Sequence, residues 1–477
     1  MNNDNRSLSQ LLHEYSQSNA CPMHMPGHKR QRFAGSCLPL ELDITEINGF
    51  DNLHQPEGIL QQAMQRAAAL YGAEQSYFLV NGSSGGILAG ICAVCKPQAT
   101  IIMARGCHKS VYHAVELRQL NPVYLGAELD DSFGVAQSIT PAQVEQAITA
   151  HPDAALVLIT SPTYEGVISD IASIAQLCHA HGIPLMVDEA HGAHLGFSPC
   201  FSGGAVAAGA DIVIQSLHKT LPSPTQTAIA HRNGSLINAT AFARQLTVFQ
   251  TSSPSYLFMA AIDDCLRFVQ QNQAQLFSAY GQRLKRFSQA MTQLKHLRVL
   301  CHGKDDMHNH SGFFGFDKGK LVISTRSTNL TGTALKDRLR EDFSIELEMA
   351  MGDYALAMTS ICDTDEMMDR LANALLSIDA ALSPVQTPLP IRLPLPPLRL
   401  APWKARMADS VLLPLEQAEN KICAESIWAY PPGIPLITAG ECITPEFLCH
   451  IHLLAAQGVE LYAETADFPH KISAVQE

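Results

Sequence analysis

The chain has 477 residues and a mass of 51.8 kDa, with 47% hydrophobic and 16% charged residues. A chain of this length can bury a large core and is longer than a typical single domain, so we expect two or three domains. The net charge of −13, from 32 Lys and Arg against 45 Asp and Glu, argues against a nucleic acid partner, because such binding depends on clustered cations.

The segment from about residue 71 to 220 alternates short apolar runs with helical patterns. Strands are predicted at 76–80, 100–104, 122–125, 154–160, 184–187 and 211–215, and helices at 85–94, 110–120, 141–150 and 170–181. This alternation predicts an α/β fold with a large, mostly parallel sheet covered on both faces. Ligands of such sheets gather where the strands end.

The pattern changes after about residue 255. A long helical stretch at 256–297 leads into short strands at 312–316 and 320–324, which indicates a smaller α+β domain. Residues 382–403 contain seven prolines, which favour extended backbone. We therefore predict four parts: an N-terminal arm at 1–50, a large domain at 51–255, a small α+β domain at 256–381 and a C-terminal domain at 382–477.

The cysteines and the apolar runs bear on the cellular location. Thirteen cysteines lie at irregular spacing in apolar stretches, which is typical of reduced thiols and indicates a cytoplasmic protein. Cys92 and Cys95 form a lone C-x-x-C on an apolar helical run, which favours packing over zinc or redox chemistry. Because no apolar run reaches the roughly 18 to 20 residues of a membrane span, and the first residues lack a signal peptide pattern, we expect neither insertion nor export.

Residues after the first two strands are suited to a phosphate and a flat ring. The first strand is followed by Asn81-Gly82-Ser83-Ser84-Gly85-Gly86 and an apolar helix. Backbone amides, hydroxyls and a helix N-terminus can together bind an anion, although an ordinary loop explains the same residues. After the second strand, His108 could stack on a planar ligand or act as an acid or base, and helix capping or solvation would also explain it.

Two later strands end in a carboxylate and an amine. Asp188 ends a buried strand, where a charge is costly unless it faces a cation, such as a protonated ring nitrogen, or a strong donor; burial against backbone amides is the alternative. Lys219, in Ser216-Leu217-His218-Lys219-Thr220, could form an imine with an aldehyde. His-Lys also occurs at positions 28, 108 and 470, but only Lys219 follows the phosphate-type loop, the histidine and the carboxylate in order. Together these features match the demands of pyridoxal 5′-phosphate.

Six motifs in this order resemble the Orn/Lys/Arg decarboxylase family, whose members are type I-fold pyridoxal-phosphate enzymes acting on basic amino acids. The similarity covers nearly the whole chain and extends to Tyr430-Pro431-Pro432-Gly433. The motifs are Met25-Pro26-Gly27-His28-Lys29, Asn81-Gly82-Ser83-Ser84-Gly85, Gly106-Cys107-His108-Lys109-Ser110, Ser161-Pro162-Thr163-Tyr164-Glu165-Gly166, Asp188-Glu189-Ala190-His191-Gly192-Ala193-His194 and Ser216-Leu217-His218-Lys219-Thr220-Leu221-Pro222.

The resemblance implies a role for each matching residue. Lys219 would form the imine with the cofactor, Asp188 would pair with the ring nitrogen, and His108 would stack on the ring. The phosphate would be held by Ser83, Ser84, Ser216 and His218, and His191 would lie beside the ring hydroxyl. The large domain would bind the cofactor, and Glu425 and the Tyr-Pro-Pro-Gly turn of the C-terminal domain would help to wall the pocket.

Three departures limit this transfer. The first motif begins at Met25, so the chain resembles the short type without the N-terminal receiver-like wing, and assembly through wings is not expected. Residues 221–227 read Leu-Pro-Ser-Pro-Thr-Gln-Thr, where the family commonly has Ala-Leu before Thr-Gln-Thr. Residues 438–441 read Thr-Ala-Gly-Glu where Pro-Gly-Glu is usual. The two sequence changes affect substrate fit more than cofactor binding.

The implied reaction is the α-decarboxylation of lysine, arginine or ornithine to CO2 and cadaverine, agmatine or putrescine, a step toward polyamines. Lys219 or His108 would protonate the carbon, and Lys219 is favoured because its amine lies beside that carbon. Glu348 and Glu425 are candidates for binding the distal cationic group, although solvated glutamates would look the same. An aminotransferase or α-oxoamine synthase of the same fold is the alternative.

Other interpretations of the chain remain open at this point. Cys301, His302, His308 and His310 could supply zinc ligands for a hydrolase, although a solvated polar loop explains them. A catalytically silent relative that binds the cofactor for regulation is also possible in principle. Enzymes of the family that this chain resembles complete their active-site pocket across a dimer contact. The resemblance therefore implies a homodimer or a multiple of it.

Overall fold

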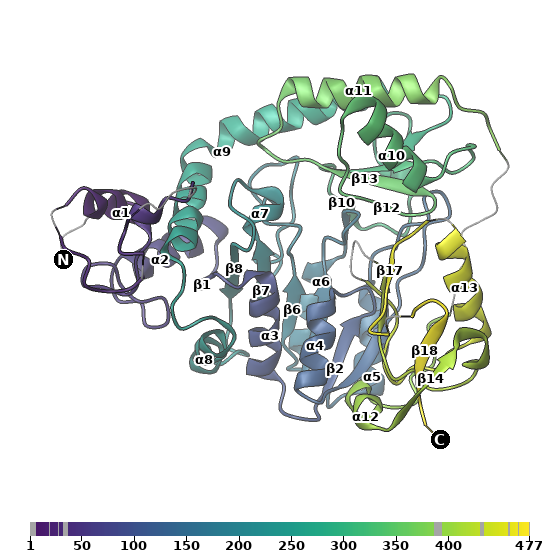
Figure 1. The fold of residues 1–477 in the computed structure, drawn as a ribbon, viewed down its shortest axis with the longest axis horizontal. Coiled ribbons are helices and arrows are strands. Elements are labelled where there is room, and N and C mark those ends of the chain that lie inside the picture. Colours follow the sequence, from purple (N-terminus) through teal and green to yellow (C-terminus); the bar gives the residue numbers. More distant parts are fainter. Residues whose placement is uncertain are drawn as a thin grey trace. The chain divides into compact units, whose positions relative to one another are not determined.

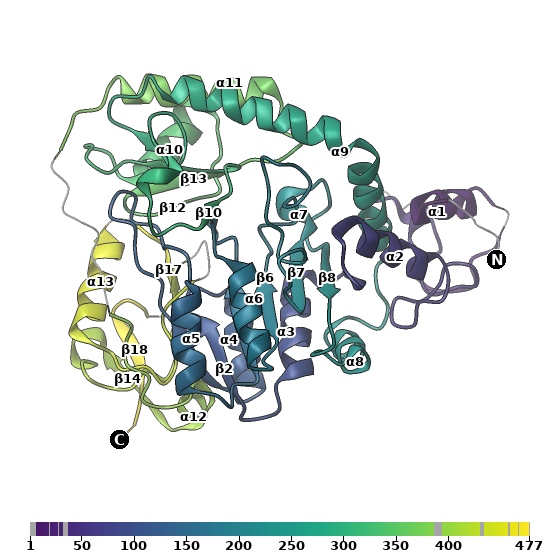
Figure 2. The same ribbon diagram turned by 180° about the vertical axis from the view of Figure 1, so that it is seen from behind.

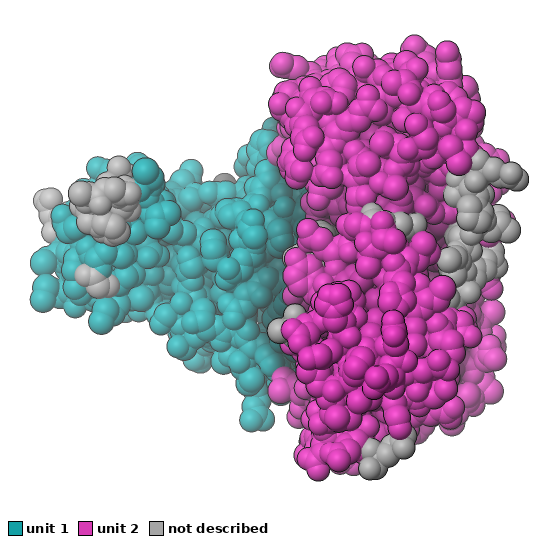
Figure 3. Space-filling view, turned by 45° about the vertical axis from the view of Figure 1, so that its right-hand side comes forward, with its two compact units in different colours: residues 1–94, 184–278 teal, residues 95–183, 279–477 magenta. Residues whose placement is uncertain are grey.

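The computed structural model describes residues 6–18, 20–26, 28–31, 37–385, 394–429, 434–456, 458–465 and 467–476. The chain divides into two compact units, coloured separately in Figure 3. Unit 1 comprises Met1–Val94 and Pro184–Ser278, and unit 2 comprises Cys95–Ile183 and Ala279–Glu477. The four sequence-based domain boundaries stay a prediction.

In unit 1, four strands lie in the order β1-β8-β7-β6, with β6 parallel to β7 and β8 antiparallel to both of its neighbours. These strands are β1 (Gln75–Leu79), β6 (Leu185–Asp188), β7 (Ile212–Ser216) and β8 (Ala228–Arg232). The helices of this unit are α1 (Leu8–Ser16), a 3-10 turn at Leu40–Leu42, α2 (Ile59–Tyr71), α3 (Gly82–Val94), α7 (Leu217–Thr220) and α8 (Ala239–Phe249). The sequence pattern missed β8, because its alanines have low β-propensity and only a four-residue helix precedes it.

Helix α3 begins at Gly82, earlier than the predicted start at residue 85, and packs closely on the strands of unit 1 (Figure 1). A Cβ at Gly86 would lie 2.5 Å from Cδ1 of Leu79, and one at Gly90 would lie 2.8 Å from Cε of Met186. Two of the glycines therefore allow close packing of helix and sheet. The first turn of α3, which contains Ser83 and Ser84, therefore lies directly after the end of β1.

In unit 2, three parallel strands lie in the order β4-β2-β3, between helices on both faces. Figure 1 shows α4 in front of β2, and Figure 2, from behind, shows α5 and α6 in front of it. The strands are β2 (Thr100–Ala104), β3 (Asn121–Leu125) and β4 (Leu156–Thr160), and the helices are α4 (Lys109–Leu117), α5 (Pro141–Ala150) and α6 (Ile171–Ala180). The Thr140 and Asp170 side chains cap α5 and α6.

The remaining segments of the predicted α+β part form an antiparallel sheet with the order β12-β13-β11-β9. Its elements are β9 (Arg298–Val299), β11 (Lys320–Ser324), α10 (Gly332–Phe343), β12 (Met349–Ala350), β13 (Tyr354–Met358) and α11 (Asp365–Asp379), with a 3-10 turn at Met307–Asn309. A short strand, β10 (Gly315–Phe316), pairs with β5 (Val167–Ile168). The preceding helix α9 (Tyr256–Met291) has residues in both units and ends before the predicted residue 297.

The C-terminal segment has its own apolar core, which includes Cys423, Ile443 and Ile472. Its elements are α12 (Pro402–Met407), β14 (Ser410–Pro414), a 3-10 turn at Leu415–Gln417, β15 (Ile427–Ala429), β16 (Ile434–Ile437), α13 (Pro445–Ala456), β17 (Leu461–Tyr462) and β18 (Lys471–Val475). Part of the proline-rich crossing lies outside the described residues. Its last proline, Pro402, opens a helix instead of extended chain, because proline suits the first helical position.

Within the described parts of the chain, no helix has both the length and the apolar character to cross a membrane. Both members of the C-x-x-C pair, Cys92 and Cys95, are buried, as expected for cysteines used in packing.

Gly166, the last residue of the Ser-Pro-Thr-Tyr-Glu-Gly motif, has a backbone conformation and close neighbours that disfavour any side chain. Its φ is +104°, and a Cβ would lie 2.8 Å from Cβ of Lys320 and 3.1 Å from the Asp317 carbonyl oxygen. Gly166→Ala should therefore lower the free energy of unfolding by about 3 kcal/mol, from strain and overpacking together. Gly182→Ala is the matched control: its φ is +68° and nothing lies within 4 Å, so only about 1 kcal/mol of strain is expected. Urea unfolding of both variants checks this, and equal losses would contradict it.

Candidate active site

An amine and an imidazole meet at the ends of two neighbouring parallel strands of unit 1. Lys219 lies in α7, directly after β7, and His191 follows β6. The Lys219 Nζ atom lies 3.0 Å from Nε2 of His191. His191 is buried and Lys219 is half-buried. The structure thus brings the predicted imine-forming lysine against a predicted cofactor residue.

Asp188, the last residue of β6, is only 2% exposed. Its Oδ1 atom accepts a hydrogen bond of 3.1 Å from the Ala190 amide. Burial raises the pKa of Asp188 above its usual range, and the charge of Lys219 offsets part of this rise. A further cation at this carboxylate, such as a protonated ring nitrogen, would stabilise its charged form.

Hydroxyls and a helix N-terminus form the third part of the site. The Ser216 hydroxyl, at the end of β7, donates to the Ser83 hydroxyl at 3.0 Å, in the first turn of α3. Ser84 is exposed in the same turn. The N-terminal amides of a helix favour an anion, so this cluster fits a phosphate.

His218 also lies at this strand end, and its hydrogen bond defines its tautomer. Nδ1 of His218 donates to the Thr227 carbonyl oxygen at 2.9 Å. Burial lowers the pKa of His218, which the bond to Thr227 offsets in part. In the neutral ring Nε2 can accept but not donate, so a contact from His218 to a phosphate requires a protonated ring.

Taken together, the unit 1 residues fit pyridoxal phosphate: an amine after β7, a buried carboxylate at the end of β6 and a hydroxyl cluster suited to an anion between the end of β7 and the start of α3. Thr220, next to Lys219, also carries a buried hydroxyl without a hydrogen-bond partner among the described residues.

A buried hydrogen-bond chain that sequence reasoning missed lies behind Asp188. Gln215 Nε2 donates to Glu189 at 2.7 Å, and the Ala205 amide donates to the other carboxyl oxygen at 2.8 Å. Gln215 Oε1 lies 3.1 Å from His231 Nε2, and His231 Nδ1 lies 2.7 Å from the Ser76 hydroxyl. Burial raises the pKa of Glu189 to about 8. A signal was present, because Glu189 and Gln215 adjoin the two predicted strand-end residues.

His108 lies in unit 2, after β2, and is the N-cap of α4. Its Nδ1 accepts from the Ser110 amide at 3.2 Å and lies 2.8 Å from the Ser110 hydroxyl. The capping interpretation is therefore correct. Capping uses the edge of the His108 ring and leaves its faces available, so it is compatible with stacking on the cofactor. The stacking itself stays a prediction.

The two candidate substrate carboxylates, both in unit 2, differ in their surroundings. Glu348 is exposed and accepts a hydrogen bond from the Tyr164 hydroxyl. Glu425 is buried, and its oxygens accept from the Thr465 amide at 2.8 Å, the Thr465 hydroxyl at 2.7 Å and the Ser473 amide at 2.6 Å. Substrate contact by either residue stays a prediction. The Tyr430-Pro431-Pro432-Gly433 turn lies outside the described residues.

The proposed zinc ligands are not gathered into a metal site. Across the described ranges, no group of three or more His, Cys, Asp or Glu residues could hold a metal ion. His310 instead lies between two carboxylates, with Nδ1 2.9 Å from Asp130 and Nε2 2.9 Å from Asp305. His308 is 98% exposed at its side chain, and His302 faces the Lys318 carbonyl oxygen at 2.9 Å.

Comparison with solved structures establishes the fold. The chain matches the constitutive lysine decarboxylase of E. coli with a TM-score of 0.80 and 19% identity, over 98% of this chain and 82% of that one. It also matches a ureidoglycine-glyoxylate aminotransferase from Bacillus subtilis with a TM-score of 0.54 and 15% identity, over 67% of this chain and 84% of that one. The predicted α/β fold of pyridoxal-phosphate enzymes, with its large, mostly parallel sheet, is confirmed.

Sequence relatives then define the family. Residues 6–321 match the major domain of Orn/Lys/Arg decarboxylases, and residues 402–461 match their C-terminal domain. The chain is 33% identical to an arginine decarboxylase of Bacillus subtilis, over 98% of this chain and 97% of the relative. It is also 33% identical to an arginine decarboxylase of Halalkalibacterium halodurans, over 92% and 91%. The chain belongs to the Orn/Lys/Arg decarboxylase family, whose enzymes are pyridoxal-phosphate-dependent carboxy-lyases.

The buried His310 cluster predicts a specific loss of stability at alkaline pH. Although burial alone lowers the pKa of His310, the bonds to Asp130 and Asp305 raise it to about 9. A raised pKa stabilises the fold fully below the unfolded value of about 6.5, and this contribution is lost as the pH rises through the folded value. His310→Gln should therefore cost about 3 kcal/mol near neutral pH and much less at about pH 10. Urea unfolding of both proteins at the two pH values measures this difference; a pH-independent difference would contradict it.

Proposed function

We propose that this family member decarboxylates arginine to agmatine and CO2. Two of its relatives at 33% identity are named arginine decarboxylases and align over nearly their full length, whereas the inducible lysine decarboxylase of E. coli is 22% identical. The observation that carries the chemistry is the 3.0 Å contact of Lys219 with His191, beside the buried Asp188. Membership of the family favours decarboxylation over the aminotransferase alternative.

In this proposal each residue has a defined task. Bound pyridoxal phosphate supplies an electron sink for the pair released when CO2 leaves. Lys219 holds the cofactor and afterwards donates a proton to the α-carbon. Asp188 keeps the ring nitrogen protonated, because its buried charge requires a cation. His191 positions the amine of Lys219, and Ser83, Ser84 and Ser216 hold the phosphate, with His218 joining them when its ring is protonated.

Glu348 is the better of the two candidates for the guanidinium group. The oxygens of Glu425 already accept three hydrogen bonds within the C-terminal segment. Glu348 is exposed, so its carboxylate retains acceptor capacity for the two parallel N–H donors of a guanidinium. We propose that it contributes to substrate recognition.

Product analysis tests the substrate assignment. Cofactor-loaded protein incubated separately with arginine, lysine and ornithine should release CO2 fastest from arginine, with agmatine as the product. Lys219→Ala is the control and should lower the rate at least about a thousandfold, because both cofactor attachment and proton donation depend on that amine. Faster turnover of lysine or ornithine would overturn the substrate assignment, and no CO2 from any of the three would overturn the proposed activity.

We further propose that the protein is a homodimer, or a multiple of one, that acts in polyamine formation in the cytosol. The thirteen cysteines, at irregular spacing in apolar stretches, support a reducing compartment. In solution, light scattering should give a mass of at least twice the 51.8 kDa of the chain. A monomeric mass for the active, cofactor-loaded protein would refute the dimer.

A further inference from the structure

Unit 2 contains a buried ion pair that the proposed chemistry does not use. Arg105, directly after β2, donates from Nη2 to Oε2 of Glu441 at 2.9 Å. The side chains are 7% and 0% exposed, respectively. Removing two charges from water costs several kcal/mol for each ion, so stability alone does not account for such a pair. A structural task at this place is the better explanation.

The contacts of Arg105 enclose the turn that carries His108. Nη1 of Arg105 donates to the Tyr112 hydroxyl at 2.9 Å, and the same hydroxyl donates to the Arg105 carbonyl oxygen at 2.6 Å. Nη1 also donates to the Pro435 carbonyl oxygen of β16 at 3.0 Å. Arg105 precedes His108 by three residues and Tyr112 follows it by four. Both ends of the turn are thus fixed to each other and to the C-terminal segment.

The partner carboxylate is held in place by a turn of its own. Oε2 of Glu441 also accepts from the Thr438 amide at 2.7 Å. Gly440 between them has a φ of +88°, and a Cβ there would lie 2.1 Å from the Leu400 carbonyl oxygen. This is the Thr-Ala-Gly-Glu segment, whose departure from the family pattern is expected to affect substrate fit. The conformation of this turn places the Glu441 carboxylate against the Arg105 guanidinium.

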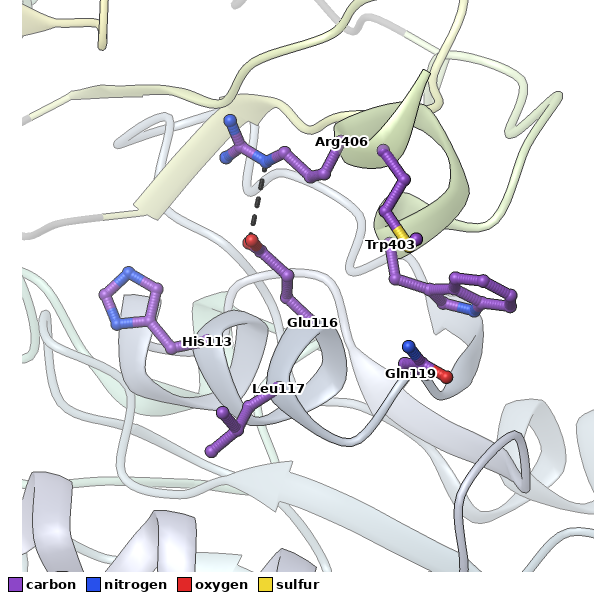
Figure 4. A pocket seen from close by; sticks show the side chains of 7 residues that line it. His113, Glu116, Leu117, Gln119, Trp403 and Arg406 are labelled. Carbon is purple, nitrogen blue, oxygen red and sulfur yellow. Dashed lines mark ion pairs between the residues drawn. The ribbon is translucent and has the colours of Figure 1, made fainter.

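A second contact holds the far end of α4 to the same segment. Figure 4 shows Glu116 of α4 facing Arg406 of α12, and their charged groups are 3.5 Å apart. The Trp428 ring of β15 meets the Tyr112 ring edge-on, with centroids 5.5 Å apart. Because His108 caps α4, the C-terminal segment contacts both the capped helix and the turn before it.

We infer that Arg105 and Glu441 are positioning residues, which act through Tyr112 and the backbone of Arg105 to fix the ring of His108. This inference rests on the proposed stacking of His108 on the cofactor. It makes the C-terminal segment part of the active-site machinery, in addition to any contact that it makes with substrate.

Tyr112→Phe is the most discriminating variant, because it removes one hydroxyl and keeps the buried ion pair. We expect kcat for arginine to fall about tenfold with KM changed less than about threefold, since a misplaced ring lowers the rate more than substrate binding. The visible circular dichroism of bound pyridoxal phosphate should change. Arg105→Lys, which loses the forked donor geometry, should show a larger change in the same direction.

Two controls separate positioning from stability. Asp379→Asn alters another buried carboxylate of unit 2, which accepts three backbone amides at 2.7–2.8 Å. It should lower the unfolding midpoint without changing kcat or the dichroism. In a His108→Ala background, Tyr112→Phe should have less than about a twofold effect, because its route of action is already removed.

The outcomes are distinct from those of the proposed function. If wild type neither binds the cofactor nor releases CO2, the proposed function fails. If wild type does both, the inference is overturned by unchanged dichroism and kcat in Tyr112→Phe, or by an undiminished effect in the His108→Ala background. Should Arg105→Lys not fold, the Tyr112→Phe results alone decide.

Discussion

The site depends on a buried carboxylate placed next to an amine at the ends of two parallel strands. Asp188 and Lys219 follow from β6 and β7, whose parallel pairing aligns Asp188 with Ile214, two residues before the end of β7. Little solvent reaches Asp188, so its charge depends on neighbouring cations. The lysine amine is one such cation, and in the proposed function a protonated ring nitrogen is the other. Binding of a cationic group beside Asp188 would therefore also stabilise the charged form of this buried carboxylate.

Each of the two units contains its own group of buried polar side chains. Glu189, Gln215 and His231 form a hydrogen-bonded chain in unit 1, in which each group has a partner. Arg105 and Glu441 form a separate pair in unit 2, in which Arg105 Nε and Glu441 Oε1 have no hydrogen-bond partner among the described residues. A buried polar network that is fully satisfied, such as the chain in unit 1, defines a single geometry. An enzyme that must hold a ring and a scissile bond at a fixed angle benefits from that rigidity more than from additional apolar packing.

Much of the fold could be predicted, because strand and helix periodicities differ and the helix caps are explicit. All eight predicted strands overlap observed ones, and helix 141–150 has the predicted limits. The strand β8 was missed because Ala228 and Ala230 lack β-propensity and its pairing is antiparallel. The start of α3 was misplaced because Gly82 normally breaks a helix, whereas here its positive φ opens one.

The site was predictable where chemistry is tied to strand ends, and less so where it depends on contacts between distant segments. Lys219 and His191 meet because both follow parallel strands, and their roles toward the cofactor stay predictions. The partner of Arg105 is 336 residues away in the sequence, and no local pattern indicates such a pair. His108 shows a further limit: one side chain can cap a helix and also serve a ligand, and a sequence pattern does not separate the two tasks.

The proposed activity requires covalent attachment of the cofactor at a single lysine. Pyridoxal-phosphate-loaded protein should be reduced with borohydride, digested and mapped by mass spectrometry. We predict that the peptide containing Lys219 carries the reduced cofactor and that the lysines of the other His-Lys pairs, Lys29, Lys109 and Lys471, remain unmodified. Attachment at any other lysine, or none at saturating cofactor, would contradict the account.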